Sequence, residues 1–289
     1  MTSHTRMRPL MGTYVEITAT GTQPLSAIEA AFDEIASIEA KLSYYNPSSD
    51  ISRINSQAPN TVLKIDSQTW HVLSICNELS YVSEGIFDIS VAPKLIQMGY
   101  LPPSVHQSAT GNWKDILLLE EGHLQLTRPV CIDLGGIAKG YCVDRAINVL
   151  RTYGLHSGAV NAGGDLRIFG PDPQPLYTKH PSFPEQTLPI TEIYNGAAAT
   201  SAAYYSRKIV DETSITPLIN TKTGLPLPCD YSVTVLAETC MMADALTKIV
   251  HSDPHSAKSI LESYNARAFL IKHNLDDDTL HIFDSHSAN

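Results

Sequence analysis

The feature of this sequence that most constrains its fold is a pair of adjacent glycines, Gly135 and Gly136, between an apolar run and a helical pattern. The apolar run ends at Ile132, and the helical pattern continues to Tyr153 and Gly154. Glycine permits a tight turn and a close approach of other groups to the backbone. The segment therefore predicts a strand that turns directly into a helix, which begins near Gly136.

The same turn has the composition of an anion site. A helix N-terminus carries unpaired N–H groups and a partial positive charge, and Lys139 adds a formal charge, a combination that suits phosphate groups. Asp133 precedes the glycines. The match is neither to a Walker loop nor to a GxGxxG fingerprint. The alternative is an ordinary tight turn followed by a surface lysine.

The remaining patterns mix hairpins with helices and do not alternate strictly between strand and helix. Helical spacing of apolar residues is found at 26–42, 67–85, 241–251 and 255–264. Strand-like segments are found at 12–19, 157–161, 165–169, 188–194 and 231–237, with hairpins over 117–126 and around 276–278. These patterns predict an α+β fold, in which a mixed or antiparallel sheet is covered by helices. We expect one domain over 1–289, or two closely packed lobes, with the proline-rich stretch 171–187 as a loop excursion.

The composition of the chain excludes several classes of binding partner and site. The net charge of -10 argues against duplex nucleic acid or an anionic membrane as the main partner. No apolar run approaches the roughly 20 residues of a membrane span. The first residues contain no signal-peptide pattern, so a cytoplasmic location is expected. The five cysteines form no CxxC pair and are odd in number, which suggests neither a zinc site nor a complete disulfide framework.

Two further turns are candidates for ligand contact. The segment 160–165 is a glycine-rich turn that could bring backbone to a ligand, or form a plain hairpin in which Asp165 bonds locally. Phe87 and Asp88 could stack on and hydrogen-bond a heterocycle, although a core phenylalanine and a capping aspartate are commoner.

Asp244 lies in an apolar helical pattern, four residues before Lys248. This spacing puts both on one helical face, where they form an ion pair or hold a carboxylate toward a metal ion or a phosphate-bound cation. His251 and His255 also stand four apart, but Pro254 breaks the helix that would align them, so a zinc hydrolase has little support.

Taken in order, these segments resemble the FAD:protein FMN transferase family of the ApbE type, formerly called thiamine-biosynthesis lipoproteins. The motifs that carry the resemblance cover nearly the whole chain: 11–13, 45–50 with 54–55, 87–89, 133–144, 160–170, 199–201, 223–224, 232–235 and 243–245. Members bind FAD and, with magnesium, transfer its FMN half to a threonine of an acceptor protein and release AMP. The resemblance implies FAD contacts at Met11, Tyr45, Ile86, Phe87, Asp88, Asp133, Gly136, Lys139 and Ile219. It also implies that the Gly136 carbonyl and Asp244 face the metal.

This chain departs from the family pattern at positions important for the chemistry. Members usually have a threonine four residues after the aspartate, where this chain has Lys248; Thr247 is one residue early and about 100° away on a helix. A protonated amine cannot ligate a divalent cation, so Lys248 is a candidate to replace one. The histidine that serves as base in the family aligns with Pro217, followed by Asn220 in place of an aspartate. The family's Thr-Ser-Gly-Asp-Tyr pattern becomes Thr-Ser-Ala-Ala-Tyr at 200–204.

Three functions remain open at this point. The first is an active FMN transferase in which Lys248 supplies part of the metal's charge. The second is a catalytically degenerate protein that only binds FAD. The third is an FAD pyrophosphatase, which would release FMN and AMP to solvent. All three predict FAD binding, and none identifies the catalytic residue.

Overall fold

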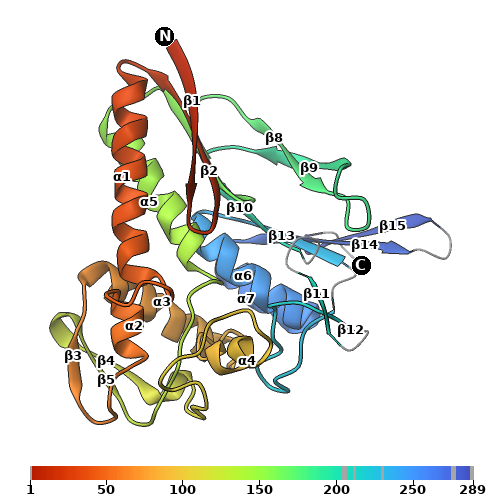
Figure 1. Cartoon of the computed structure of the whole chain (residues 1–289). Coiled ribbons are helices and arrows are strands. Elements are labelled where there is room, and N and C mark those ends of the chain that lie inside the picture. Colours follow the sequence, from red (N-terminus) through yellow and green to blue (C-terminus); the bar gives the residue numbers. More distant parts are fainter. Residues whose placement is uncertain (1, 203–206, 211–212, 229–230, 275–277, 287–289) are drawn as a thin grey trace. The chain divides into compact units, whose positions relative to one another are not determined.

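The computed structural model of the protein describes residues 2–202, 207–210, 213–228, 231–274 and 278–286. Its contacts divide the chain into two compact units, whose secondary structure is drawn in Figure 1. Unit 1 comprises Met1–Ala36, Lys139–Thr216 and Leu227–Asn289. Unit 2 comprises Ser37–Ala138 and Pro217–Pro226.

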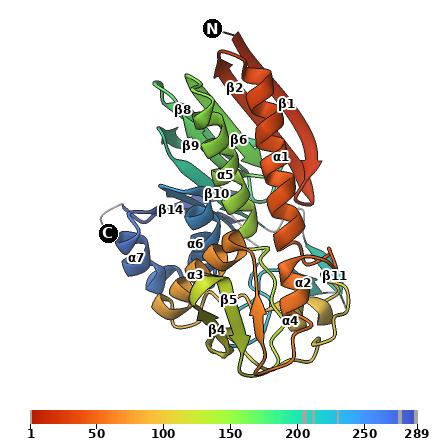
Figure 2. The same ribbon diagram turned by 90° about the vertical axis from the view of Figure 1, so that its left-hand side faces the viewer.

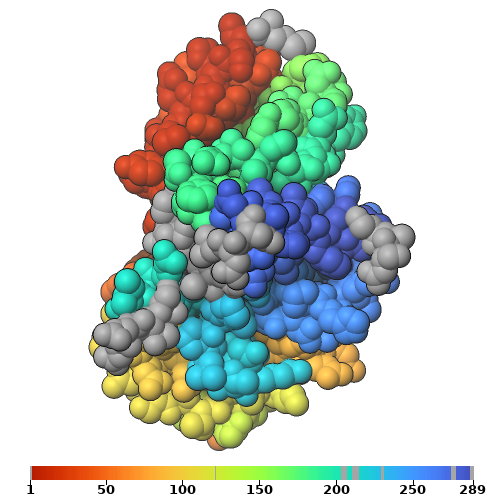
Figure 3. All heavy atoms as spheres, turned by 90° about the vertical axis from the view of Figure 1, so that its right-hand side faces the viewer, coloured from red at the N-terminus to blue at the C-terminus, as the bar shows by residue number. Residues whose placement is uncertain are grey.

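Unit 1 is built on one eight-stranded antiparallel sheet. The strand order is β1-β2-β6-β7-β10-β13-β14-β15. The strands are β1 (Thr2–Leu10), β2 (Thr13–Gly21), β6 (Ser157–Ala162), β7 (Asp165–Phe169), β10 (Ala197–Ser201), β13 (Tyr231–Ala237), β14 (Arg267–Asn274) and β15 (Thr279–Asp284). Strand β15 forms one edge, and its segment lies at the surface in dark blue in Figure 3.

Alternation and tight turns explain the first strands. Val15, Ile17 and Ala19 are buried on one face of β2, as the period of two requires. Strands β1 and β2 are joined by a two-residue turn, in which Met11 and Gly12 have φ of 55° and 69°. Positive φ at both central residues matches the twist of a hairpin and is cheap at glycine.

The helices of unit 1 follow the predicted apolar spacing. They are α1 (Pro24–Leu42, which continues into unit 2), α5 (Ala138–Thr152), α6 (Cys240–Ser252) and α7 (Pro254–Ser263). Helix α6 contacts β10, β13 and β7. Figure 2 shows α5 beside the first part of α1, in front of β2 and β6, and the two helices are joined by an ion pair between Arg145 Nη2 and Glu34 Oε1 at 2.8 Å.

The proline-rich stretch 171–187 is not loop throughout. It contains β8 (Gln174–Lys179), which pairs with β9 (Thr187–Ile193) in a two-stranded sheet. Leu176 and Ile193 of this hairpin are buried against Ile168 and Ala198 of the main sheet. Burial of Leu176 and Ile193 thus helps to order a segment that its prolines suggested to be loop. Unit 1 also contains a short hairpin of β11 (Lys208–Val210) and β12 (Thr213–Ile215).

Unit 2 has a smaller sheet, with strand order β3-β5-β4. Its elements are α2 (Asp50–Ile54), β3 (Val62–Lys64), α3 (Ser67–Val82), α4 (Ala92–Gln97), β4 (Ile116–Leu119), β5 (His123–Leu126) and two short 3-10 helices, Trp113–Asp115 and Glu120–Gly122. The predicted hairpin over 117–126 is therefore present. Asp66 caps α3 by accepting the N–H of Gln68.

The predicted α+β class, with an antiparallel sheet and helices, is confirmed. The helix expected to open at Gly136 begins two residues later, at Ala138, and the strand expected to end at Ile132 is not formed, because residues 129–134 are extended chain without a sheet partner among the described residues. Residues 276 and 277 of the predicted closing turn, and 203 and 204 of the altered family pattern, lie outside the described residues.

Candidate functional site

Four charged side chains from three elements of unit 1 form one cluster. Lys139 comes from the first turn of α5, Asp165 from the start of β7, and Asp244 and Lys248 from α6. Lys139 Nζ lies 2.7 Å from Asp165 Oδ2 and 3.6 Å from Asp244 Oδ2. Lys248 Nζ lies 2.6 Å from Asp244 Oδ1. We call these four residues the charge cluster.

The acidic members of the charge cluster are buried, whereas the lysines reach the surface. The side chains of Asp244 and Asp165 are 0% and 4% exposed, against 27% for Lys139 and 24% for Lys248. Burial alone would disfavour both carboxylates in their charged form. The cluster therefore depends on its internal ion pairs.

The carboxyl pKa values diverge within the cluster. Burial and the nearby Asp244 raise the pKa of Asp165 to about 6, against the opposing effect of Lys139. Burial would also raise the pKa of Asp244, but the charges of Lys139 and Lys248 hold it below its ordinary value. Burial would lower the pKa of Lys139, yet Asp165 and Asp244 raise it above its ordinary value. Asp244 is thus the firmly ionised carboxylate, and Lys139 is firmly cationic.

The position of Asp165 differs from its simplest sequence interpretation. Gly163 and Gly164 do form a two-residue hairpin turn between β6 and β7, with φ of 64° and 104°. However, Asn161 makes the local bond, because its Oδ1 accepts the N–H of Gly164 at 2.9 Å. Asp165 instead pairs with Lys139, which the spacing of the two residues along the chain did not reveal.

Magnesium does not fit the residues around Asp244. Its Oδ1 faces the ammonium of Lys248, while its Oδ2 accepts the N–H of Gly140 at 3.3 Å and faces Lys139. Both oxygens are therefore engaged by positive or N–H groups, whereas magnesium requires oxygen ligands and is repelled by an ammonium. Within the described parts of the chain, no group of three His, Cys, Asp or Glu side chains could hold a metal ion.

A second buried ion pair, absent from the predicted site, holds the start of α6. Arg167 Nη1 of β7 donates to Asp144 Oδ1 of α5 at 2.6 Å. Asp144 also accepts the main-chain N–H groups of Cys240 and Met241, at 2.8 and 2.9 Å, and so satisfies the first turn of α6. The available signal was an arginine inside an apolar strand, which must find a carboxylate when it is buried.

Gly140 allows α5 to approach the start of α6. A Cβ atom at this position would lie 2.3 Å from the carbonyl oxygen of Cys240 and 2.7 Å from Met241 Cα, which are backbone atoms that cannot move aside easily. The last glycine of the segment 133–140 therefore sets the packing that brings Lys139 near Asp244.

The predicted phosphate turn belongs partly to unit 2, and its N–H groups are largely paired. Asp133 Oδ2 accepts the N–H of Gly135 at 2.9 Å, and the carbonyl of Leu134 accepts those of Ile137 and Ala138 at 3.0 and 2.9 Å. The expectation of unpaired N–H groups at this turn is thus wrong for Gly135, Ile137 and Ala138, because the Asp133 carboxylate and the Leu134 carbonyl accept them. Gly136 lies within the turn and is partly exposed.

The segment 86–89 of unit 2 is partly buried and is hydrogen-bonded to Asp133. Ile86 and Phe87 are buried, with exposed fractions of 9% and 4%. Asp88 Oδ1 accepts the N–H of Ser90 at 2.8 Å, and burial raises the pKa of Asp88. The N–H of Asp133 donates to Ile89 O at 2.9 Å, so the structure brings together the Asp88 and Asp133 segments that the sequence singled out.

The segment that contains Pro217 packs on the same part of unit 2. Thr221 Oγ1 donates to the carbonyl oxygens of Gly85 and Ile86, at 2.5 and 3.3 Å. Ile219 is buried, and Asn220 Oδ1 closes a turn by accepting two following N–H groups. An aspartate side chain can close a turn in the same way, so Asn220 is compatible with this local structure, while Pro217 provides no side-chain base.

Tyr45 and Met11, two further predicted FAD contacts, belong to different units. Tyr45, in unit 2, is 68% exposed, and its ring meets that of Tyr44 edge to face at 5.9 Å between centroids. Met11, in the β1–β2 turn of unit 1, receives a hydrogen bond from Cys142 Sγ at 3.6 Å. The exposed ring of Tyr45 is available for stacking.

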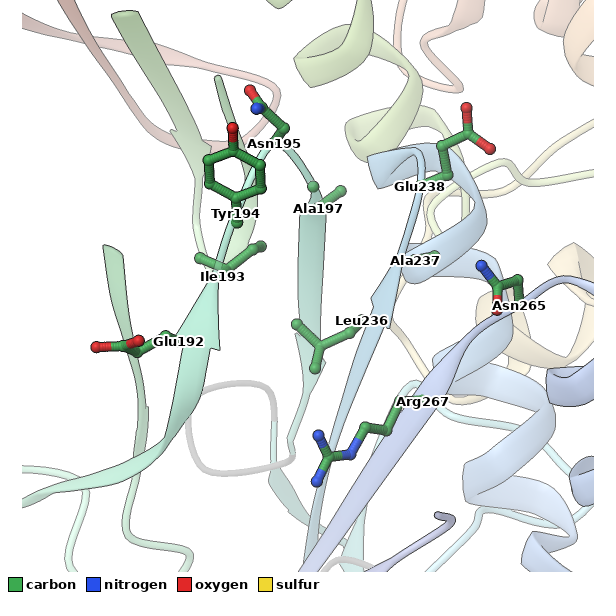
Figure 4. A pocket seen from close by; sticks show the side chains of 11 residues that line it. Glu192, Ile193, Tyr194, Asn195, Ala197, Leu236, Ala237, Glu238, Asn265 and Arg267 are labelled. Atoms are coloured by element: carbon green, nitrogen blue, oxygen red, sulfur yellow. The ribbon is translucent and has the colours of Figure 1, made fainter. Parts of the chain in front are cut away.

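A hollow elsewhere on unit 1 lies apart from the predicted site residues. It lies among the ends of β9, β10 and β13 and the start of β14, and Figure 4 shows its charged residues, Glu192, Glu238 and Arg267. Arg267 is already held by both carboxylate oxygens of Asp284, at 3.0 and 2.6 Å. None of the predicted site residues lines it.

Comparison with known proteins identifies the family. The ApbE family model matches residues 11–270. A protein of Vibrio cholerae named FAD:protein FMN transferase is 28% identical over 228 residues, which cover 72% of this chain and 68% of that protein. One of the same name from Haemophilus influenzae is 28% identical over 279 residues, covering 88% and 80%. The chain therefore belongs to the ApbE family, as the sequence motifs predicted.

Solved structures support the same fold. The ApbE protein of Thermotoga maritima has a TM-score of 0.83 at 25% identity, with coverage of 97% of this chain and 96% of that one. The apo form of the Pseudomonas stutzeri flavinyl transferase ApbE has a TM-score of 0.84 at 19% identity, covering 99% of this chain and 95% of that one, and this likeness concerns the fold alone.

Among the described helices, none has both the length and the apolar character needed to cross a membrane.

Proposed function

We propose that this chain is an FAD:protein FMN transferase, which transfers the FMN half of FAD to a threonine hydroxyl of an acceptor protein and releases AMP. The observation that carries the proposal is the convergence of Lys139 and Asp244, 105 positions apart in the sequence, with Nζ and Oδ2 at 3.6 Å. Both belong to motifs of the family, whose model spans residues 11–270. Relatives that carry the name of this activity match most of the chain.

The reaction converts the phosphoanhydride of FAD into a phosphate ester of the acceptor threonine. The threonine oxygen forms a bond to the phosphorus of the FMN half, the bond from that phosphorus to the oxygen shared with AMP breaks, and the hydroxyl proton is released. Positive charge near the pyrophosphate stabilises the charge that develops on the phosphate oxygens. Lys139, which is firmly cationic and partly exposed, is our candidate for that role.

The other residues implied by the family remain candidates for FAD contact. Exposed Tyr45 offers a ring for stacking, and Asp88 and Asp133 offer carboxylates. Met11, Ile86, Phe87, Gly136 and Ile219 are proposed on the resemblance. No general base is assigned, because the family's histidine position is Pro217. The cytoplasmic location and the identity of the acceptor stay predictions.

Incubation of the purified protein with FAD and a threonine-containing acceptor tests the proposal. AMP release together with covalent flavin fluorescence on the acceptor is the expected result. Release of both AMP and free FMN, without labelled acceptor, would identify an FAD pyrophosphatase instead. FAD binding without AMP release would identify a catalytically degenerate binding protein, the alternative suggested by Pro217 at the position of the family's histidine.

Two lysine variants test whether Lys139 contributes to the transfer rate. Lys139→Met removes the proposed phosphate-facing charge and is expected to lower the transfer rate at least about a hundredfold, within the range for loss of one electrostatic contact in a phosphate or oxyanion site. Lys258→Met removes an exposed lysine of α7 and is expected to leave the rate unchanged. Equal rates in the two variants would remove Lys139 from the mechanism.

A further inference from the structure

The ammonium group of Lys248 is enclosed by oxygen atoms of its own helix. Its Nζ lies 2.6 Å from Asp244 Oδ1, 3.0 Å from Thr247 Oγ1 and 3.2 Å from the main-chain oxygen of Asp244. A lysine ammonium has three N–H donors and no acceptor, so three partners satisfy it completely. The group is therefore fixed in place.

Thr247 is part of this enclosure, although its position on the helix predicted that it would point away. Its hydroxyl donates to the main-chain oxygen of Asp244 at 2.6 Å and is left free to accept from Lys248. The side chain is fully buried. A threonine one residue early thus takes part in binding a cation, which here is the lysine ammonium.

The three enclosing atoms are a carboxylate, a hydroxyl and a carbonyl oxygen, which are the kinds of ligand that hard divalent cations take. We propose that the ammonium of Lys248 is the resident cation of this site and excludes a divalent metal ion. The role of this cation in FAD chemistry rests on the proposed function, which uses the same site. Ion binding itself is measured without FAD, so each proposal can fail alone.

Charge balance supports the inference. The charge cluster contains two lysines and two aspartates, all within unit 1, so its formal charge is zero when both carboxylates are ionised. A divalent ion that entered would face two ammonium groups and would gain no uncompensated carboxylate. Replacement of Lys248 by a neutral side chain leaves one negative charge and frees Asp244 Oδ1.

Manganese binding, followed by electron paramagnetic resonance at pH 8 without FAD, tests the proposal. The wild-type protein is expected to bind no Mn²⁺ at this site up to millimolar concentration. Lys248→Thr opens the space, adds a hydroxyl and leaves the cluster negative, so its affinity for Mn²⁺ is expected to rise at least tenfold. Lys258→Thr makes the same chemical change on the exposed face of α7 and is expected to produce no gain.

A second variant keeps the test decisive if Lys248→Thr does not fold. Lys248→Met removes the charge without adding a polar group, and it too is expected to bind Mn²⁺ more tightly than the wild type. Circular dichroism shows which variants are folded. The proposal is overturned if the wild type binds Mn²⁺ as tightly as the Lys248 variants, or if Lys258→Thr gains as much as they do.

Discussion

Asp144 illustrates how one buried carboxylate can organise several elements. It pairs with Arg167 of β7 and accepts the first two N–H groups of α6. Burial raises its pKa, although Arg167 and the two N–H groups oppose that effect. Removing its charge leaves the guanidinium of Arg167, whose side chain is 10% exposed, without a counter-charge.

The Asp144→Asn variant is therefore expected to lose about 3–5 kcal/mol of unfolding free energy, the usual cost of breaking a buried pair from one side. Urea denaturation measures this loss. Asp172→Asn, at an exposed position, serves as control and should be within about 0.5 kcal/mol of the wild type. Combining Asp144→Asn with Arg167→Met should restore part of the loss, and a purely additive double variant would contradict the pairing.

For Gly140→Ala, helix propensity and the packing of α5 on α6 predict opposite changes in stability. Gly140→Ala on propensity alone would stabilise α5 by up to about 1 kcal/mol. The added methyl group would lie 2.3 Å from a backbone oxygen of α6, and overpacking of this kind costs about 1–3 kcal/mol. We expect net destabilisation in urea. Gly196→Ala is the control, because its nearest neighbours are at 3.5 Å, and a larger loss in the control would refute the argument.

In unit 2, the 3-10 helix Trp113–Asp115 is tied to the end of β5 by one carboxylate. Asp115 accepts from Thr127 at 2.7 Å and from Arg128 at 2.9 and 2.8 Å. The hydrogen bonds from Arg128 hold the pKa of Asp115 well below its ordinary value, against the effect of burial.

Because the folded state lowers this pKa, the stabilisation is present above about pH 4, the ordinary value, and is lost as the pH falls below it. Asp115→Asn should therefore be less stable than the wild type at pH 7, and the difference should shrink toward pH 2.5. The exposed Arg128 limits the size of the effect. Thermal unfolding across this pH range measures it, with Asp172→Asn again as control; a difference that stays constant with pH would contradict the assignment.

Secondary-structure elements with a clear apolar period could be predicted from the sequence. Helix α1 buries one face, and β13 has the predicted bounds, 231–237. Strand β1 could not be predicted, because Thr2–Leu10 forms an edge strand whose side chains are mostly exposed and show no apolar alternation. Strand β10 could not be predicted either, since its Ala-Ala-Ala-Thr-Ser sequence lacks large apolar side chains and is buried by pairing between β7 and β13.

For the whole molecule and its candidate site, too, the sequence predicted only part of the structure. The family motifs identified Lys139, Asp244 and the unusual Lys248. The pairs Lys139–Asp165 and Asp144–Arg167 each join α5 to β7, two elements whose proximity in space no local sequence pattern encodes. Unit 2 is likewise made from two segments, Ser37–Ala138 and Pro217–Pro226, which no change of composition separates from the rest.

FAD binding should stabilise the whole protein without any metal. A ligand that binds only the folded state adds about 2.7 kcal/mol when its free concentration is 100 times its Kd, so FAD should raise the melting temperature in a dose-dependent way. Since Lys248 supplies the cation near Asp244, the rise should be the same in magnesium and in a chelator. The Lys248→Thr variant should instead show a larger rise with magnesium, because its cluster carries an unbalanced carboxylate. The absence of any rise would count against FAD as the ligand, whereas a rise in the wild type that requires magnesium would count against the lysine as its resident cation.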